Sequence, residues 1–196
     1  MTTLYISYDG MTDPLGQSQV LPYLKGLSEK GIRIVLLSFE KQERFETTKP
    51  VIEDLCRKAG IVWVPLMYTK KPPVFSTLWD VFKMKRTLLR LHRQYHFTLV
   101  HCRSHIPAIG GNYLKRKAGV PYLFDMRGFY ADERVDGGLW KMSNPLLKRV
   151  YHYFKAKEKV FLKNAAATIS LTEAGKNIIH HWEGFEHIPI EVIPCC

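Results

Sequence analysis

The stretch that decides the fold runs from residue 4 to residue 39 and is written LYISYDGMTDPLGQSQVLPYLKGLSEKGIRIVLLSF. Residues 5–7 predict a short first strand. Residues 17–29 carry apolar side chains at helical spacing, and Gly31 follows as a typical helix end. Residues 32–39 are a β-branched and aliphatic run with buried-strand character. Strand, helix and strand in this order indicate one unit of a parallel α/β sheet.

The same alternation continues along the chain. Strands are expected at residues 61–64 (stopped by Pro65), 97–102, 121–124, 167–171 and 190–193, and helices at 51–58, 76–95, 107–117, 145–164 and 172–181. A long polar loop is expected at residues 125–138. Helices of this length between strands require right-handed crossovers. The pattern therefore predicts a Rossmann-like, doubly wound parallel sheet of six or seven strands, whose ligands bind at the carboxyl ends of the strands.

Composition is consistent with one well-packed domain, which we place at residues 1–193, and with a cytoplasmic location. Of the 196 residues, 46% are hydrophobic, yet no apolar run approaches the ~20 residues of a membrane-spanning helix. The N-terminus lacks the pattern of a signal peptide. Cys56 and Cys102 have no neighbouring ligand cluster, so no metal site is expected. Cys195 and Cys196 are too close together to favour a mutual disulfide.

The net charge of +11 is concentrated in one segment. Residues 70–117 hold 11 basic side chains and a single acid, Asp80, whereas the remaining chain is nearly balanced. Such a localised excess predicts an anionic partner or surface.

The helix expected at residues 76–95 has two faces. Its apolar stripe should pack on the sheet and comprises Val81, Met84, Leu88, Leu91 and Tyr95. Its basic stripe lies on the far side, flanked by Trp79, Phe82 and Leu89, and comprises Lys83, Arg86, Arg90 and Arg93. A basic face bordered by apolar groups suits an anionic membrane surface. A solvated helix face is the alternative.

Three loops at the predicted carboxyl edge carry candidate binding groups. Residues 8–18 include Gly10 and Gly16 and open a helix, whose free amide groups favour anions. The six-residue spacing of these glycines does not match a dinucleotide fingerprint, and a plain turn that caps the helix is the alternative.

The other two loops follow the fourth and fifth strands. The fourth strand leads into Arg103 and His105, after His101, which is expected to be buried. The fifth leads into Arg127 and Glu133. Arg127 is the sharpest candidate because a guanidinium binds phosphate or carboxylate in a bidentate manner. A solvated loop that pairs its own charges is the alternative.

Together these loops resemble the N-terminal domain of family-4 glycosyltransferases. The resemblance rests on YISYDGMTDPLGQSQ at 5–19, VHCRSH at 100–105 and FDMRGFYADER at 124–134, and VIPCC at 192–196 is similar to the segment that leads into a second domain. It implies one half of a GT-B enzyme, in which two Rossmann-like domains face a cleft. Such enzymes transfer a sugar from a nucleotide sugar with retention, usually without a metal or other cofactor.

The resemblance also implies roles for parts of the chain. The N-terminal domain takes a saccharide or lipid-linked acceptor, and a C-terminal domain, absent here, holds the nucleotide sugar. Gly16 matches the glycine loop near the donor phosphates, and Arg127 stands where many relatives have histidine. We expect acceptor or phosphate binding by Gly16, Gln17, Arg103, His105, Arg127 and Glu133, and leave the catalytic residues unassigned.

The full-length protein is thus expected to be a hexosyltransferase-type enzyme of polysaccharide biosynthesis, peripheral on the inner face of the membrane. Residues 194–196 would begin the linker, and this chain alone would be inactive. A non-catalytic anion- or membrane-binding module is the main alternative. A receiver domain would need an aspartate where Val64-Pro65-Leu66 stands, and no nucleic-acid recognition motif is present, so no nucleic-acid partner is expected.

Overall fold

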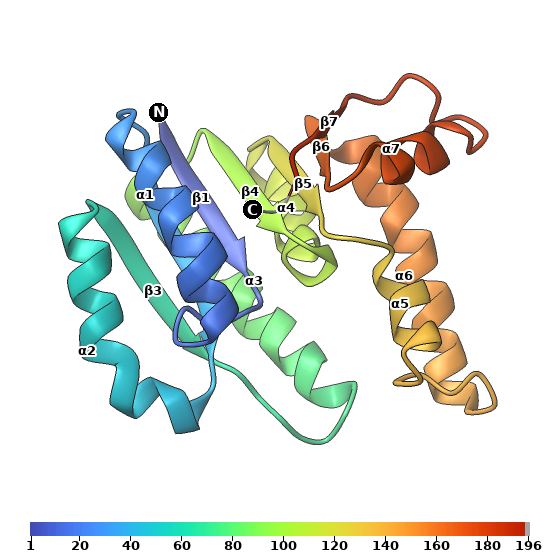
Figure 1. The fold of residues 1–196 in the computed structure, drawn as a ribbon, viewed down its shortest axis with the longest axis horizontal. Helices are drawn as coiled ribbons and strands as arrows, with labels where there is room; N and C mark the ends of the chain where they lie inside the picture. The colour runs from blue at the N-terminus through green and yellow to red at the C-terminus, as the bar shows by residue number, and fades with distance from the viewer. Residues whose placement is uncertain (195–196) are drawn as a thin grey trace.

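The computed structural model describes residues 1–194, which form a seven-stranded parallel sheet flanked by helices (Figure 1). The strand order is β3-β2-β1-β4-β5-β6-β7. The chain therefore starts in the middle of the sheet, winds to one edge and then to the other. This confirms the doubly wound, Rossmann-like sheet, with its switch point between β1 and β4. Cys195 and Cys196, with most of the expected linker, lie outside the described residues.

The elements follow the predicted alternation. The strands are β1 (Thr2–Ser7), β2 (Arg33–Glu40), β3 (Ile61–Met67), β4 (Leu99–Arg103), β5 (Tyr122–Met126), β6 (Ala167–Ser170) and β7 (Ile190–Val192). The helices are the π-helical turn η1 (Gly16–Val20), α1 (Leu21–Glu29), α2 (Gln42–Lys58), α3 (Phe75–Tyr95), α4 (His105–Ala118), α5 (Tyr130–Asp136), α6 (Pro145–Asn164) and α7 (Glu173–His180).

The structure departs most from the prediction in three places. Pro65 does not stop the third strand, because β3 is an edge strand and needs no amide donor on its outer side. Helix α2 begins at Gln42 rather than at residue 51 and includes Pro50. The expected polar loop at residues 125–138 contains the short helix α5.

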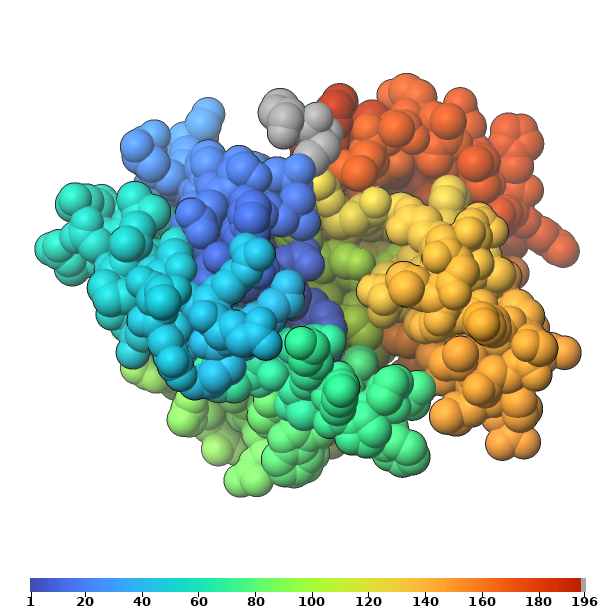
Figure 2. Space-filling model, turned by 60° about the horizontal axis from the view of Figure 1, so that its bottom comes forward, coloured from blue at the N-terminus to red at the C-terminus, as the bar shows by residue number. Residues whose placement is uncertain are grey.

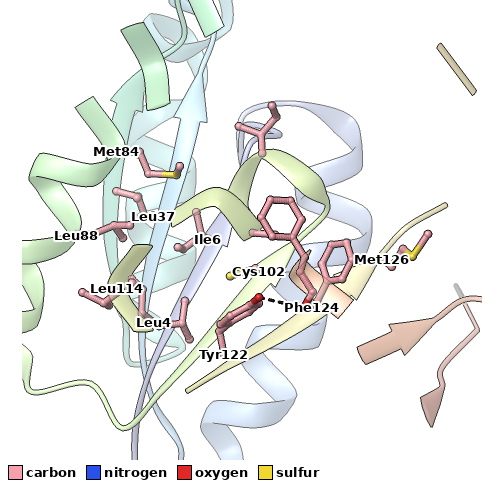
Figure 3. Close-up of a cluster of buried hydrophobic side chains, with 14 of the residues drawn as sticks. Leu4, Ile6, Leu37, Met84, Leu88, Cys102, Leu114, Tyr122, Phe124 and Met126 are labelled. Atoms are coloured by element: carbon pink, nitrogen blue, oxygen red, sulfur yellow. Dashed lines mark hydrogen bonds between the residues drawn. The ribbon is translucent and has the colours of Figure 1, made fainter. Parts of the chain in front are cut away.

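Strands β1, β2 and β3 send alternate side chains into two separate cores. The larger core joins Leu4 and Ile6 of β1 to α3, α4 and α6 (Figure 3). Within it, the Tyr122 hydroxyl donates a hydrogen bond of 3.0 Å to the Phe161 carbonyl. The smaller core joins Tyr5 of β1 to α1 and α2, and among the described residues it includes none from β4, β5 or β6. Part of that face of the sheet is thus left for a cavity.

Both described cysteines are buried and free. Burial, with the Glu40 carboxylate as a second cause, raises the pKa of the Cys56 thiol to about 12. Burial also raises the pKa of the Cys102 thiol. Since the thiolate is the reactive form, we expect alkylation of both residues at pH 8 to be at least about a hundredfold slower in the native than in the urea-unfolded protein. Peptide mapping after iodoacetamide labelling measures this, and equal rates would contradict the burial.

Helix α3 packs its predicted apolar stripe on the sheet. Val81, Met84 and Leu88 are at most 8% exposed. Lys83, however, does not belong to the exposed basic stripe. Its ammonium lies 2.7 Å from Asp80 Oδ1 and 2.5 Å from the Met67 carbonyl oxygen. The fully buried Asp80 carboxylate holds Lys83 against β3, so the exposed stripe consists of Arg86, Arg90 and Arg93.

Candidate functional site

The loop after β1 is fixed by the fully buried carboxylate of Glu40 at the end of β2. This carboxylate accepts hydrogen bonds from the amides of Met11 (2.9 Å) and Thr12 (3.0 Å) and from the Thr12 hydroxyl (2.7 Å). The Ser38 hydroxyl donates a further bond. A Cβ at Gly10 would lie 2.7 Å from Glu40 Oε2 and 3.0 Å from the Phe39 carbonyl oxygen, so a larger residue there would displace the carboxylate. No sequence motif marks Glu40, and its role was not predicted.

Gly16 is required for the packing of this loop. A Cβ at Gly16 would lie 2.2 Å from the Gly10 carbonyl oxygen and 2.7 Å from Met11 Cα. The Gln17 side chain donates to the Thr12 carbonyl at 3.2 Å. Gly16 and Gln17 therefore hold the loop together, and the structure places both outside the lining of the adjacent cavity.

A cavity of about 310 Å³ opens at the carboxyl edge of the sheet, at the switch point between β1 and β4. Its walls come from β1, from η1 and the start of α1, and from the carboxyl ends of β4, β5 and β6 and the segments that follow them. It is lined by Tyr5, Ser18, Gln19, Pro22, Tyr23, His101, Arg103, Asp125, Arg127, Ile169, Ile193 and Pro194. This is the place where doubly wound sheets bind ligands.

Two arginines converge on one oxygen in this cavity. Gln19 Oε1 accepts hydrogen bonds from Arg103 Nη2 at 2.9 Å and from Arg127 Nη2 at 3.3 Å. Arg103 Nε lies 3.5 Å from Asp9 Oδ2, and Arg127 Nη1 lies 3.8 Å from Asp125 Oδ1. Arg103 is only 5% exposed. Two guanidinium groups held this close, in a partly desolvated place, favour the binding of an anion.

The floor of the cavity carries the buried polar side chains of Tyr5, His101 and Asp125, beside the more exposed Tyr23. His101 Nε2 lies 3.4 Å from Asp125 Oδ2, and the His101 ring is centred 4.5 Å from that of Tyr5 and 5.8 Å from that of Tyr23. Burial raises the pKa of both phenols, with Asp125 as the next cause. Tyr5 and Tyr23 are therefore neutral hydrogen-bond donors at neutral pH. Asp125 Oδ1 is buried and makes no hydrogen bond within the described residues.

His105 does not line the cavity, contrary to the prediction. The backbone turns at Ser104 (φ 73°), α4 begins at His105, and the imidazole enters the larger core on the other face of the sheet. There it is 1% exposed, with Nε2 at 3.0 Å from Glu158 Oε2 and its ring centred 5.3 Å from that of Tyr130.

Glu133 is not among the residues that line this cavity either. It lies on α5 and lines a second, more open hollow together with Asp132, Asp136, Ile178 and Trp182. Among residues 1–194 no three His, Cys, Asp or Glu side chains are grouped in a way that could hold a metal ion.

Figure 2 views the molecule from the end that lies at the bottom of Figure 1. The start of α3 (teal and green) and the α5–α6 region (yellow and orange) stand on opposite sides of a hollow.

Of the residues that line the cavity, the sequence had identified two as binding candidates, Arg103 and Arg127. It missed Gln19, which joins them, because one polar residue near a helix start has no distinguishing pattern.

The chain matches the family model described as Glycosyltransferase Family 4 over residues 17–196. No curated protein matches its sequence. Among solved structures, it is similar to sucrose-phosphate synthase from Thermosynechococcus elongatus, with a TM-score of 0.70 and 13% identity, covering 100% of this chain and 48% of that chain.

Two further solved structures are similar. One is a ugt transferase from Siraitia grosvenorii in complex with UDP (TM-score 0.62, 11% identity, 98% of this chain and 50% of that chain). The other is HepE from Anabaena in complex with UDP and glucose (TM-score 0.60, 13% identity, 100% of this chain and 44% of that chain). The chain thus spans about half the length of each of these structures, and at these identities the likeness shows the fold alone.

Proposed function

We propose, on the premise that this chain belongs to Glycosyltransferase Family 4, that it forms the acceptor-side half of an enzyme that transfers a sugar from a nucleotide sugar with retention. Its Rossmann-like sheet corresponds to one half of the GT-B fold. In this proposal a second domain, which holds most of the nucleotide sugar, faces the carboxyl edge of the sheet. The family match favours the enzyme over a non-catalytic anion-binding module.

The observation that carries the proposal is the convergence of Arg103 and Arg127 on Gln19. Sugar transfer breaks the bond between the anomeric carbon and the donor phosphate, so negative charge develops on the leaving diphosphate. Guanidinium groups that are held in place before the reaction stabilise such charge without reorganisation. Gln19 would keep the two side chains together until the phosphate binds them.

The acceptor is proposed to be a saccharide or a lipid-linked saccharide on the cytoplasmic face of a membrane, as in polysaccharide biosynthesis. None of the helices within residues 1–194 is long and apolar enough to span a bilayer. In this proposal the domain contacts the membrane through its surface, where the exposed Arg86, Arg90 and Arg93 supply cationic groups.

Substitution of Arg127 tests the proposed site. In the whole protein that contains this domain, Arg127→Ala should lower the turnover of sugar transfer at least tenfold, which corresponds to about 1.4 kcal/mol of transition-state stabilisation. Radiolabelled transfer from a panel of UDP-sugars and GDP-sugars measures this. Arg116→Ala, at an exposed position near the end of α4, is the matched control and should be neutral. Unchanged kinetics in a folded Arg127→Ala variant would disprove the role of the residue.

A further inference from the structure

The first two turns of α3 expose an apolar surface. Phe75 is 64% exposed, Leu78 60%, Trp79 54% and Phe82 46%. We refer to these four residues as the α3 tip. Their spacing of 3, 1 and 3 residues places them on one face of the helix, opposite the buried stripe. The rings of Trp79 and Phe82 stack with their centres 5.4 Å apart. Contiguous apolar surface of this kind usually marks an interaction site.

The exposed arginines continue the same face of α3. At 100° per residue, Arg86, Arg90 and Arg93 fall within the arc of about 120° that the α3 tip also occupies. The Arg86 guanidinium carbon lies 5.6 Å from the centre of the Phe82 ring, so the cationic and apolar parts are in contact. The face therefore changes from apolar to cationic along about 27 Å of helix.

No exposed acid interrupts this face. Asp80 is the single acid of residues 70–117, and its carboxylate is fully buried. It accepts hydrogen bonds from the Tyr8 hydroxyl (2.9 Å), the Thr69 amide (3.1 Å) and the Thr69 hydroxyl (2.8 Å). These bonds tie the start of α3 to the loop after β1. The α3 tip is thereby held at the carboxyl edge of the sheet, which also carries the cavity.

We propose that the α3 tip inserts into the interfacial layer of an anionic bilayer, with Arg86, Arg90 and Arg93 on the lipid headgroups. The assignment to a bilayer follows from charge complementarity. A row of arginines that no exposed acid interrupts, continuous with exposed aromatic rings, matches an anionic bilayer surface. Insertion would turn the carboxyl edge of the sheet toward the membrane. The placement of a lipid-linked acceptor there rests on the proposed function, but the insertion does not.

Vesicle co-sedimentation of this chain tests the proposal. At low salt the chain should bind vesicles of phosphatidylcholine with one quarter phosphatidylglycerol, and should bind pure phosphatidylcholine at least tenfold more weakly. Trp79→Ser/Phe82→Ser should weaken binding to the anionic vesicles at least tenfold, as should Arg86→Glu/Arg90→Glu. Because all four side chains are exposed, circular dichroism should show both variants folded.

Two matched controls have the same chemistry elsewhere on the surface. Val51→Ser/Leu55→Ser removes exposed apolar groups from α2, and Arg116→Glu/Lys117→Glu reverses exposed charges on α4. Both should bind like the wild type.

The depth of insertion can be measured separately by fluorescence quenching. Bromine-labelled acyl chains should quench tryptophan fluorescence in the wild type, and Trp79→Phe should remove most of this quenching.

Three results would overturn the insertion. The first is that the wild type does not bind anionic vesicles, and the second is that Trp79→Ser/Phe82→Ser binds them fully. The third is that the two control variants lose as much binding as the α3 variants they are matched to. Retention by the apolar variant would mean that the basic residues only adsorb to the surface. Vesicle binding in a whole protein without sugar transfer would instead remove the proposed function and leave the insertion intact.

Discussion

Replacing Glu40 with alanine is expected to lower the free energy of unfolding by about 4 kcal/mol. The fully buried carboxylate accepts hydrogen bonds from two amides and two hydroxyl groups, on Met11, Thr12 and Ser38. Alanine would leave these four donors buried without an acceptor. Because Glu40 also fixes the loop that leads into Gln19, the binding of a nucleotide sugar by the whole protein should weaken too. Urea denaturation followed by circular dichroism measures the loss of stability.

Two variants make the Glu40 experiment specific. Glu40→Gln preserves the shape of the side chain but exchanges one acceptor oxygen for a donor. It should therefore lower the free energy of unfolding by about half as much as Glu40→Ala does. Glu43→Ala removes an exposed carboxylate from the first turn of α2 and should change stability by less than about 0.5 kcal/mol. A Glu40→Ala protein within 1 kcal/mol of the wild type would show that water replaces the carboxylate, contrary to its buried placement.

The fold class could be predicted from the sequence because the patterns that identify each strand and helix are local. The run at residues 32–39 and the apolar spacing of α3 each identify an element without knowledge of its neighbours. The position of a strand in the sheet is not local information. Pro65 would stop a central strand, and it is accommodated because β3 lies at the edge. Likewise, the polar sequence of residues 130–136 gave no apolar stripe strong enough to predict α5.

The candidate site was predictable only in part. Arg103 and Arg127 were identified because each lies at the carboxyl end of a strand. The cavity floor depends on register, which pairs Tyr5 with His101 and Arg103 with Asp125 across neighbouring strands. No short pattern in one strand specifies its register with the next. His105 failed as a prediction because one backbone turn beyond β4 sends its side chain to the opposite face of the sheet.

The placement of His105 in the larger core leads to a second prediction with a large expected effect on stability. Its imidazole is enclosed by aromatic rings, with the centre of the Phe124 ring at 5.1 Å and that of Tyr130 at 5.3 Å. Its polar partner is Glu158, which is 1% exposed and also accepts a hydrogen bond of 2.9 Å from Lys155. Removing the imidazole would both open a cavity among these rings and take away one of the partners of a buried carboxylate.

His105→Ala should therefore lower the free energy of unfolding by about 4 kcal/mol, the combined effect of truncating a core ring and breaking a buried polar pair. Urea denaturation of this chain measures it. His187→Ala, at an exposed position, is the control and should change stability by less than about 0.5 kcal/mol. Glu158→Gln keeps the volume of the side chain and should lower the free energy of unfolding by less than His105→Ala does. If His105→Ala were as stable as the wild type while sugar transfer by the whole protein was lost, His105 would belong to the binding site after all, and its assignment to the core would be wrong.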